Sequence, residues 1–129
     1  MTIVKREYQG EQEYIMSDSS SFKIPLFDGR RNKFSMFWYK LKAYAALKEF
    51  LPALQDGGEP DMPNDEATPL NARTDAGQVA AKKRNAMAMA AFTMAFTTAS
   101  AMMFVRKACN INWPSGLAHV IVKELFKKF

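Results

Sequence analysis

The chain has 129 residues and a formal net charge of +5. This length suits one domain, which buries roughly two thirds of the surface that the unfolded chain exposes. A single cysteine excludes an internal disulfide, and a single histidine excludes a histidine pair for metal binding. We therefore expect no metal site and no cofactor.

Ala, Met and Phe dominate the apolar residues, whereas Val and Ile are scarce. Because Ala and Met favour helices and β-branched residues favour strands, this composition predicts an all-α fold. The spacing of the apolar residues indicates a single small helical bundle of about four to five helices, with an extended N-terminal arm and a long acidic loop.

Basic residues gather in the second half, where residues 81–129 hold eight Lys or Arg against one Asp or Glu. Such an excess favours contact with polyanions such as RNA, although Lys and Arg also occupy the solvent faces of ordinary helices. The candidates for RNA contact are Lys82, Lys83, Arg84, Arg106 and Lys107. The N-terminus is too polar for a signal peptide, and Thr2 excludes the Gly that myristoylation requires, so we expect a cytoplasmic protein.

Residues 1–21 are rich in Glu, Gln, Ser and Asp and show no sustained apolar period, which predicts a flexible arm. The domain predicted for residues 22–129 opens with an extended segment. In that segment Phe22, Ile24 and Leu26 alternate with other residues, and we expect their side chains to lie against the bundle.

A first helix is predicted after a turn at Asp28-Gly29, with Asn32 as its N-cap. Its apolar residues recur at intervals of three and four and form one stripe. The stripe consists of Phe34, Phe37, Trp38, Leu41, Tyr44, Ala45, Leu47 and Leu51. Pro52 ends or kinks this helix. Aromatic residues at helical spacing are far more often core than surfaces on which bases stack, so replacement of Trp38 is expected to unfold the domain.

Residues 55–73 contain three prolines and five acidic residues, which predicts a long acidic loop. A loop of more than about 15 residues inside a domain is uncommon and is usually functional or mobile. The spacing of its acidic residues does not suggest a pair of catalytic carboxylates.

Thr74 or Asp75 is expected to cap the next helix, which continues to Phe96. The following Thr and Ser residues weaken the helix propensity, and Thr98 can cap a further helix that ends at Lys107. The alternative is one uninterrupted helix from 75 to 109.

A turn at residues 110–112 precedes the last helix, and Pro114 suits its first position because the missing amide proton has no partner there. The buried stripe predicted for this helix consists of Leu117, Val120, Ile121, Leu125, Phe126 and Phe129.

Residues 85–105 contain no charged side chain, and this stretch is as long as the ~20 residues that span a bilayer. Ala, Met and Thr are common in this stretch, which favours the central helix of a bundle over a membrane span. The methionines from Met87 to Met103 would suit an adaptable interface, since Met repacks easily, and core packing is at least as good an explanation.

The sequence has no glycine-rich phosphate-binding motif and no Gly-x-Ser-x-Gly nucleophile motif. We expect Cys109 to be a buried small side chain, because it lies near a helix end where the dipole disfavours a thiolate. We expect His119 on a helix surface next to a loop, without the nucleophile and orienting partner of a general base. We therefore expect no enzymatic activity and no small-molecule substrate.

The first helix and its approach resemble the N-terminal part of Gag polyproteins from copia-like and gypsy-like LTR retrotransposons. In that family a Phe-x-Gly precedes a helix that contains an aromatic residue and a Trp, and the end of the chain is similar to a variant of a second family helix. The residues that carry the resemblance are Phe27, Gly29, Phe34, Phe37, Trp38, Leu41, Tyr44, Trp113, Leu117, Leu125 and Phe129.

The resemblance implies the N-terminal lobe of a capsid protein, since the chain is too short for both lobes and lacks the Cys and His residues of the family's RNA-binding knuckle. It implies self-assembly into a shell around element RNA, as a homo-oligomer in a cytoplasmic virus-like particle, with no membrane partner. The alternative that the residues leave open is a small basic RNA-binding or protein-interaction adaptor that does not assemble.

Overall fold

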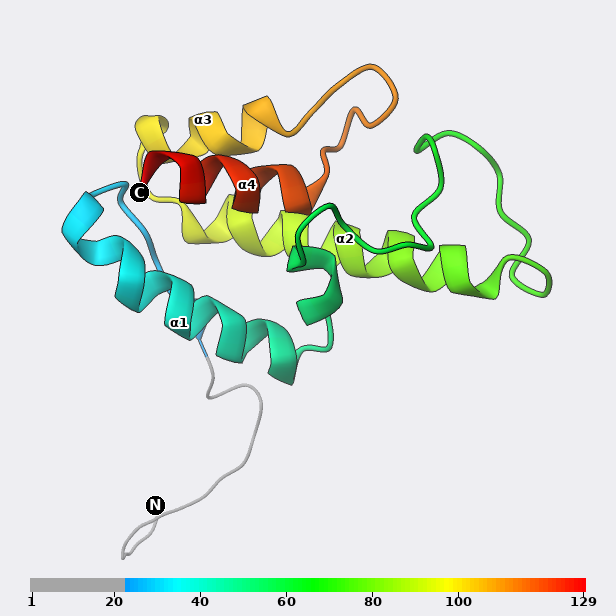
Figure 1. Ribbon diagram of the computed structural model, residues 1–129, viewed down its shortest axis with the longest axis horizontal. Coiled ribbons are helices and arrows are strands. Elements are labelled where there is room, and N and C mark those ends of the chain that lie inside the picture. The colour runs from blue at the N-terminus through cyan, green and yellow to red at the C-terminus, as the bar shows by residue number, and fades with distance from the viewer. Residues whose placement is uncertain (1–22) are drawn as a thin grey trace, which may run out of the picture.

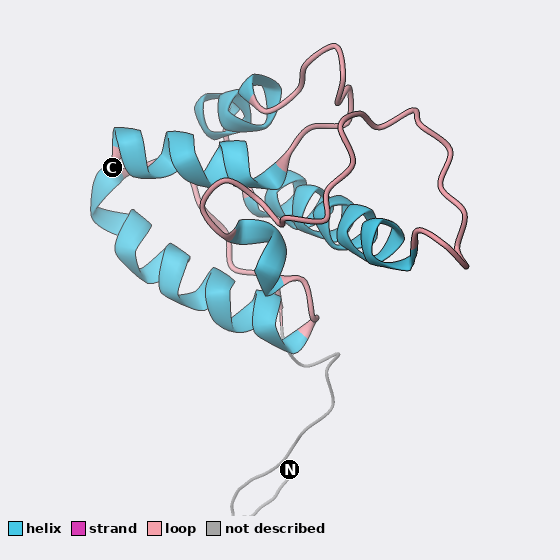
Figure 2. Cartoon of the chain, turned by 45° about the vertical axis from the view of Figure 1, so that its right-hand side comes forward, coloured by secondary structure: helices cyan, strands magenta, loops and turns pink. Residues whose placement is uncertain are grey.

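The computed structural model describes residues 23–129, and these residues form an all-α domain (Figure 1). Its elements are α1 (Arg31–Leu47), the short 3-10 helix η2 (Leu51–Leu54), α2 (Ala76–Ala95), α3 (Ala99–Lys107) and α4 (Ala118–Lys128). Figure 2 shows helices and loops but no strand in this part of the chain. The predicted fold class is confirmed. The predicted arm at residues 1–21 and Phe22 lie outside the described residues.

The start of α1 differs from the prediction, because Asn32 lies inside the helix and does not cap it. The N-cap position is Arg30, which makes no side-chain capping bond. The turn that precedes it is held by Asp28, whose carboxylate accepts hydrogen bonds from the Arg30 amide (3.0 Å) and from Arg30 Nε (2.8 Å). Since this turn is complete at Arg30, the helix begins one residue before Asn32.

The end of α1 also differs, because the helix stops at Leu47 and Pro52 lies in η2. The Phe50 amide donates to the Ala45 carbonyl at 2.9 Å, and Glu49 has a positive φ of 65°. These features define a Schellman motif, in which a left-handed residue ends the helix and a buried apolar residue follows it. Phe50 is the residue that follows, and its burial ends the helix before Pro52.

The extended segment before α1 is fixed by Phe27, which forms an isolated bridge with Phe96. The Phe27 amide donates to the Ala95 carbonyl at 2.9 Å, and the Thr97 amide donates to the Phe27 carbonyl at 3.0 Å. Ile24 packs against the core as predicted, but Leu26 is 65% exposed. Successive side chains of an extended chain point to opposite sides, so burial of Phe27 turns Leu26 outward.

The predicted break between the second and third long helices is confirmed, which excludes one helix from 75 to 109. The Thr98 hydroxyl accepts a hydrogen bond from the Ala101 amide at 3.2 Å and donates one to the Asp28 carbonyl at 3.0 Å. The same side chain thus caps α3 and fixes the turn before α1. Asp75 occupies the N-cap position of α2, but its carboxylate accepts from the Asn71 amide instead of capping.

The last helix begins at Ala118, so Pro114 is not its first residue as predicted. Pro114 lies in a turn closed by a hydrogen bond from the Gly116 amide to the Trp113 carbonyl (2.9 Å). Gly116 has a φ of 94°, a conformation that cannot continue into a helix and that favours glycine. The chain therefore leaves the turn at Gly116 before α4 can start.

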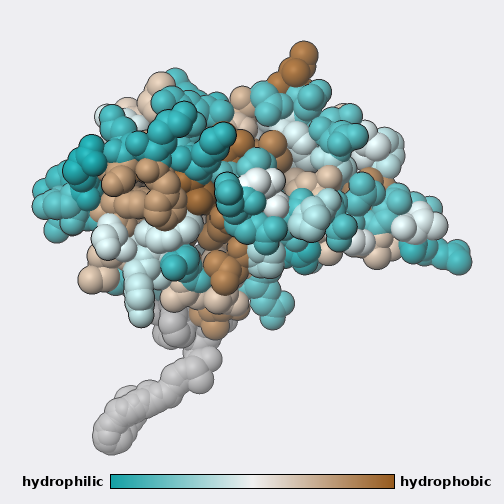
Figure 3. Space-filling model, in the orientation of Figure 1, coloured by the Kyte–Doolittle hydropathy of each residue, from teal (hydrophilic) through white to brown (hydrophobic). Residues whose placement is uncertain are grey.

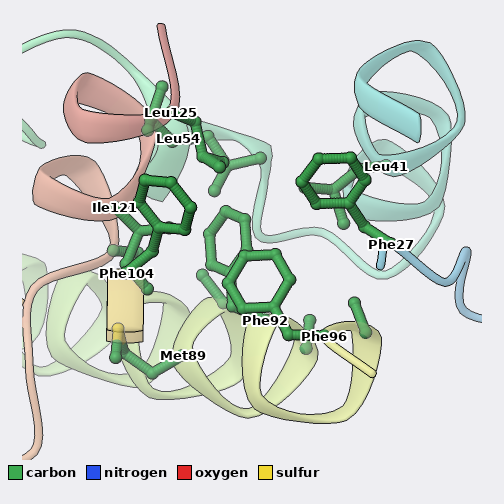
Figure 4. Packing of buried hydrophobic residues seen from close by; sticks show 14 of the residues in the cluster. Phe27, Leu41, Leu54, Met89, Phe92, Phe96, Phe104, Ile121 and Leu125 are labelled. Atoms are coloured by element: carbon green, nitrogen blue, oxygen red, sulfur yellow. The ribbon is translucent and has the colours of Figure 1, made fainter. Parts of the chain in front are cut away.

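Aromatic side chains join α1 to the other helices (Figure 4). Phe27 is 1% exposed, stacks on Phe37 with ring centroids 4.8 Å apart, and meets Phe129 edge to face at 5.4 Å. Phe34 also stacks on Phe129 at 5.2 Å. Large rings fill the space between α1 and the group of α2, α3 and α4, so the helix backbones need not approach closely.

The residues that carry the family resemblance contribute to this core in different degrees. Six are buried: Phe27, Phe34, Phe37, Leu41, Trp113 and Leu125. Four are half-buried: Trp38, Tyr44, Leu117 and Phe129. The eleventh, Gly29, lies in the turn before α1.

Three residues predicted for the buried stripes are exposed, namely Leu47, Leu51 and Phe126. Leu47 is the last residue of α1 and Leu51 lies in η2, beyond the helix whose stripe was predicted to include it. Val122, which the predicted stripe omitted, is buried instead of Phe126.

Candidate functional site

The loop between η2 and α2 binds two of the side chains predicted to contact RNA. Arg84 forms a bidentate pair with Glu59, in which Nη2 and Nε donate to the carboxylate at 2.6 and 3.0 Å. This hydrogen bonding raises the pKa of Arg84. Lys82 Nζ donates to the Glu66 carbonyl at 2.7 Å, whereas Lys83 is exposed. Lys82 and Arg84 therefore hold the acidic loop on α2.

Glu66 ties the same loop to the connection between α3 and α4. Its carboxylate accepts hydrogen bonds from the Ser115 hydroxyl (2.6 Å) and the Ser115 amide (2.8 Å), which lower the pKa of Glu66. The loop also meets α4 at Gly58, which is buried against the His119 ring; a Cβ on Gly58 would lie only 2.7 Å from His119 Cδ2. Residues 55–75 contain no helix or strand, yet polar bonds fasten them to Lys82 and Arg84 of α2 and to Ser115 in the connection before α4.

A second group of basic residues surrounds a pocket between α3, α4 and the turn before α1. We call this the α3–α4 pocket; it has a volume of about 450 Å³. Its apolar lining includes Met103, Phe104 and Phe129. Its edge carries Lys107, Lys127 and Lys128, which we call the basic rim. The rim is close to one carboxylate, since Glu124 lies 3.9 Å from Lys107 Nζ and 3.5 Å from Lys127 Nζ.

The basic rim follows from where two helices end. Lys107 lies in the last turn of α3, and Lys127 and Lys128 lie in the last turn of α4, where cations interact favourably with the helix dipoles. The sequence prediction included Arg106 and Lys107 but missed Lys127 and Lys128. The overlooked signal was the same pattern of paired basic residues at the end of an amphipathic helix.

A third feature is an apolar surface over α1, η2 and α4. We define the α1–η2 apolar face as Trp38, Leu51, Pro52 and Phe126. Trp38, Leu51 and Pro52 line a pocket of about 410 Å³, and Phe126 meets Trp38 edge to face with centroids 5.0 Å apart. Phe126 is 53% exposed and Leu51 is 38% exposed. Figure 3 shows hydrophobic residues between α1, η2 and α4, beneath a band of hydrophilic residues along α4.

The methionines predicted for an adaptable interface divide between core and surface. Met89 is buried against the turn at Gly116, whereas Met94 and Met103 are exposed. Core packing therefore explains Met89, and an adaptable interface at Met94 and Met103 stays a prediction. Ile111, at the connection between α3 and α4, is 94% exposed.

Cys109 and His119 are the single cysteine and the single histidine of the chain. Cys109 is exposed after α3, which corrects the prediction that it is buried; α3 ends at Lys107 and its buried side falls on Ala108. His119 lies in α4 beside the loop, as expected, but it is half-buried instead of on the helix surface, and this burial lowers its pKa. Residues 23–129 contain no group of three His, Cys, Asp or Glu residues that could hold a metal ion. Among the helices described, none is both long and apolar enough to span a bilayer.

Comparisons of the chain with protein-family models, with curated proteins and with solved structures found no match. The fold and surfaces thus define a class only: a small basic all-α domain with one amphipathic pocket and one exposed apolar face.

Proposed function

We propose that this chain is a structural protein, a Gag-like capsid lobe that self-associates into a shell around element RNA in the cytoplasm. The observation that supports assembly most directly is the α1–η2 apolar face. Large apolar side chains that stay exposed next to a well-filled core mark a surface that another protein covers. A second copy is the partner that a capsid lobe requires, because closed shells are built from repeated symmetric contacts.

Assembly is tested with the full chain by light scattering over a concentration series and by negative-stain electron microscopy. We expect scattering to rise steeply with concentration and particles or filaments to appear. Leu51→Glu places a charge in the apolar face and should abolish both signals. Ile111→Glu makes the same chemical change at a more exposed position outside that face and should leave them intact. A chain that stays monomeric at high concentration, or two variants that behave alike, would refute the proposal.

A second candidate function is RNA binding without assembly, and the basic rim is the observation that favours it. Lys107, Lys127 and Lys128 are exposed around one pocket, whereas Lys82 and Arg84 are bound to the loop. This function predicts binding to single-stranded RNA whose affinity falls steeply with salt.

The paired variant Lys127→Glu/Lys128→Glu tests this alternative. It should weaken RNA binding and reduce the salt dependence by about 0.7 in the logarithmic slope for each phosphate that the rim no longer neutralises. Lys40→Glu/Lys42→Glu on α1 is a control with the same change in net charge. Equal losses from both pairs would mean that overall charge, and not the rim, drives binding. No binding at low salt would remove this function.

A further inference from the structure

The α3–α4 pocket has a chemistry that defines what it can bind. Its interior is apolar, lined by Met103, Phe104 and Phe129, and its edge carries three lysines against the single carboxylate of Glu124. An occupant that satisfies both parts combines carboxylates with aromatic or aliphatic side chains. A purely acidic ligand would leave the interior uncovered, and a purely apolar ligand would bury three lysines that only Glu124 balances.

The chain itself contains a segment of this composition. Residues 7–16 read Glu-Tyr-Gln-Gly-Glu-Gln-Glu-Tyr-Ile-Met, with three carboxylates and no Lys or Arg. Tyr8, Tyr14 and Ile15 supply the apolar component. We call residues 7–16 the acidic segment. Its three carboxylates complement the basic rim, where one carboxylate, that of Glu124, lies among three lysines.

We propose that the acidic segment binds the α3–α4 pocket of the same chain. Covalent reach permits this. Gly29 lines the pocket and lies six residues after Lys23. The distance from Lys23 to the pocket is therefore at most that of six extended residues, about 20 to 22 Å. The seven steps from Met16 to Lys23 span up to about 23 to 25 Å, which is enough to return to the pocket.

Tethering favours this occupant over a separate acidic peptide. A segment joined by a short linker has an effective concentration of roughly millimolar, so even weak contacts keep it bound. Bound there, it covers Lys107, Lys127 and Lys128, the basic residues that an RNA would contact at this pocket. The acidic segment therefore acts as an internal competitor of polyanions. This inference does not depend on assembly of the chain.

The exposed Cys109 gives a way to test the inference in the full chain, because it is the only cysteine and lies two residues after Lys107. A nitroxide spin label on Cys109 broadens the amide NMR signals of nearby residues. At low salt we expect broadening of residues 7–16 that exceeds that of residues 1–5. High salt should remove the difference, since the rim is exposed and its charges are screened.

Matched variants decide whether the pocket is responsible. Lys127→Glu/Lys128→Glu, and separately Glu11→Gln/Glu13→Gln, should reduce the broadening of residues 7–16 to the level of residues 1–5. Lys33→Glu/Lys40→Glu changes two lysines of a different pocket, beside Pro25, and should leave it unchanged. Unchanged indole signals of Trp38 and Trp113 show that each variant is folded.

Three results would overturn the inference. The first is equal broadening throughout residues 1–16 in the parent chain, and the second is an equal decrease in the rim and control pairs. The third comes from mixing spin-labelled chains of natural isotope abundance with isotope-labelled chains that carry no spin label. Broadening that persists in this mixture would assign the acidic segment to a second copy.

Discussion

The buried side chain of Asn85 makes the most informative target for a stability measurement. Asn85 lies in α2, is 5% exposed, and is the only buried polar residue among residues 23–129. Its Nδ2 donates to the Gly116 carbonyl at 2.9 Å, and its Oδ1 accepts from the Ala118 amide at 2.8 Å. Ala118 is the first residue of α4, so Asn85 satisfies an amide that α4 itself cannot.

Asn85→Ala leaves both backbone groups without partners in a buried site. An unsatisfied buried donor or acceptor costs about 1 to 3 kcal/mol, so with two such groups the expected loss of unfolding free energy is about 2 to 6 kcal/mol. Domains of this kind have unfolding free energies of about 5 to 15 kcal/mol, so the variant should lose a substantial fraction of the total. Urea denaturation followed by circular dichroism measures the loss, and hydrogen exchange should show faster exchange of the Ala118 amide.

Asn32→Ala is the matched control for this experiment. Asn32 is exposed on α1, makes no capping bond, and gains the same helix propensity from the change to Ala. The unfolding free energy of the Asn32→Ala variant should stay within about 0.5 kcal/mol of that of the parent chain or rise slightly. A loss below about 1 kcal/mol for Asn85→Ala, or equal values for the two variants, would refute the role assigned to Asn85.

Three further outcomes follow from the same structure. Phe27→Ala removes the ring that stacks on Phe37 at the junction with α1. It should lower the unfolding free energy measured by urea denaturation by about 3 to 5 kcal/mol. A loss below about 1 kcal/mol would contradict the central position of Phe27 in the core. Gly116→Ala forces a φ of 94° on a residue with a side chain and should cost about 1 to 3 kcal/mol by the same measurement; an unchanged midpoint would contradict the strain. Burial lowers the folded-state pKa of His119 below its ordinary value of 6.5, so the unfolded chain binds more protons between the two values. The stability that His119 contributes is therefore present above pH 6.5 and is lost as the pH falls through the folded pKa. Unfolding free energies measured over a pH series should show this loss, and the dependence on pH should be weaker in His119→Gln. An equal dependence on pH in the variant would contradict the lowered pKa of His119.

Much of the fold followed from local patterns. The apolar spacing of Phe34, Phe37 and Leu41 predicted α1, and the weak helix formers around Thr98 predicted the break before α3. These predictions held because they depend on propensity and on the period of 3.6 residues, which neighbouring residues determine. The predicted ends of helices were less accurate. Glu49 and Gly116, both with positive φ, set boundaries that Pro52 and Pro114 were expected to set.

The surfaces depended on contacts between residues far apart in the sequence. From the sequence, Lys82 and Arg84 were predicted to be available for RNA. In the structure the loop places the Glu66 carbonyl beside Lys82 and the Glu59 carboxylate beside Arg84. The separation of Lys107 from Lys127 along the chain concealed a shared pocket.

The sequence by itself determined that this protein is helical, basic and rich in aromatic and methionine residues, since composition and periodicity are local properties. Only the tertiary structure decided which charges are neutralised and which apolar residues stay exposed. Phe126 and Leu125 are adjacent in one amphipathic helix, yet Leu125 is fully buried and Phe126 is half exposed against Trp38. Burial depends on which elements pack around a side chain, and those around α4 include α3 nearby in the sequence and also η2, more than 60 residues away.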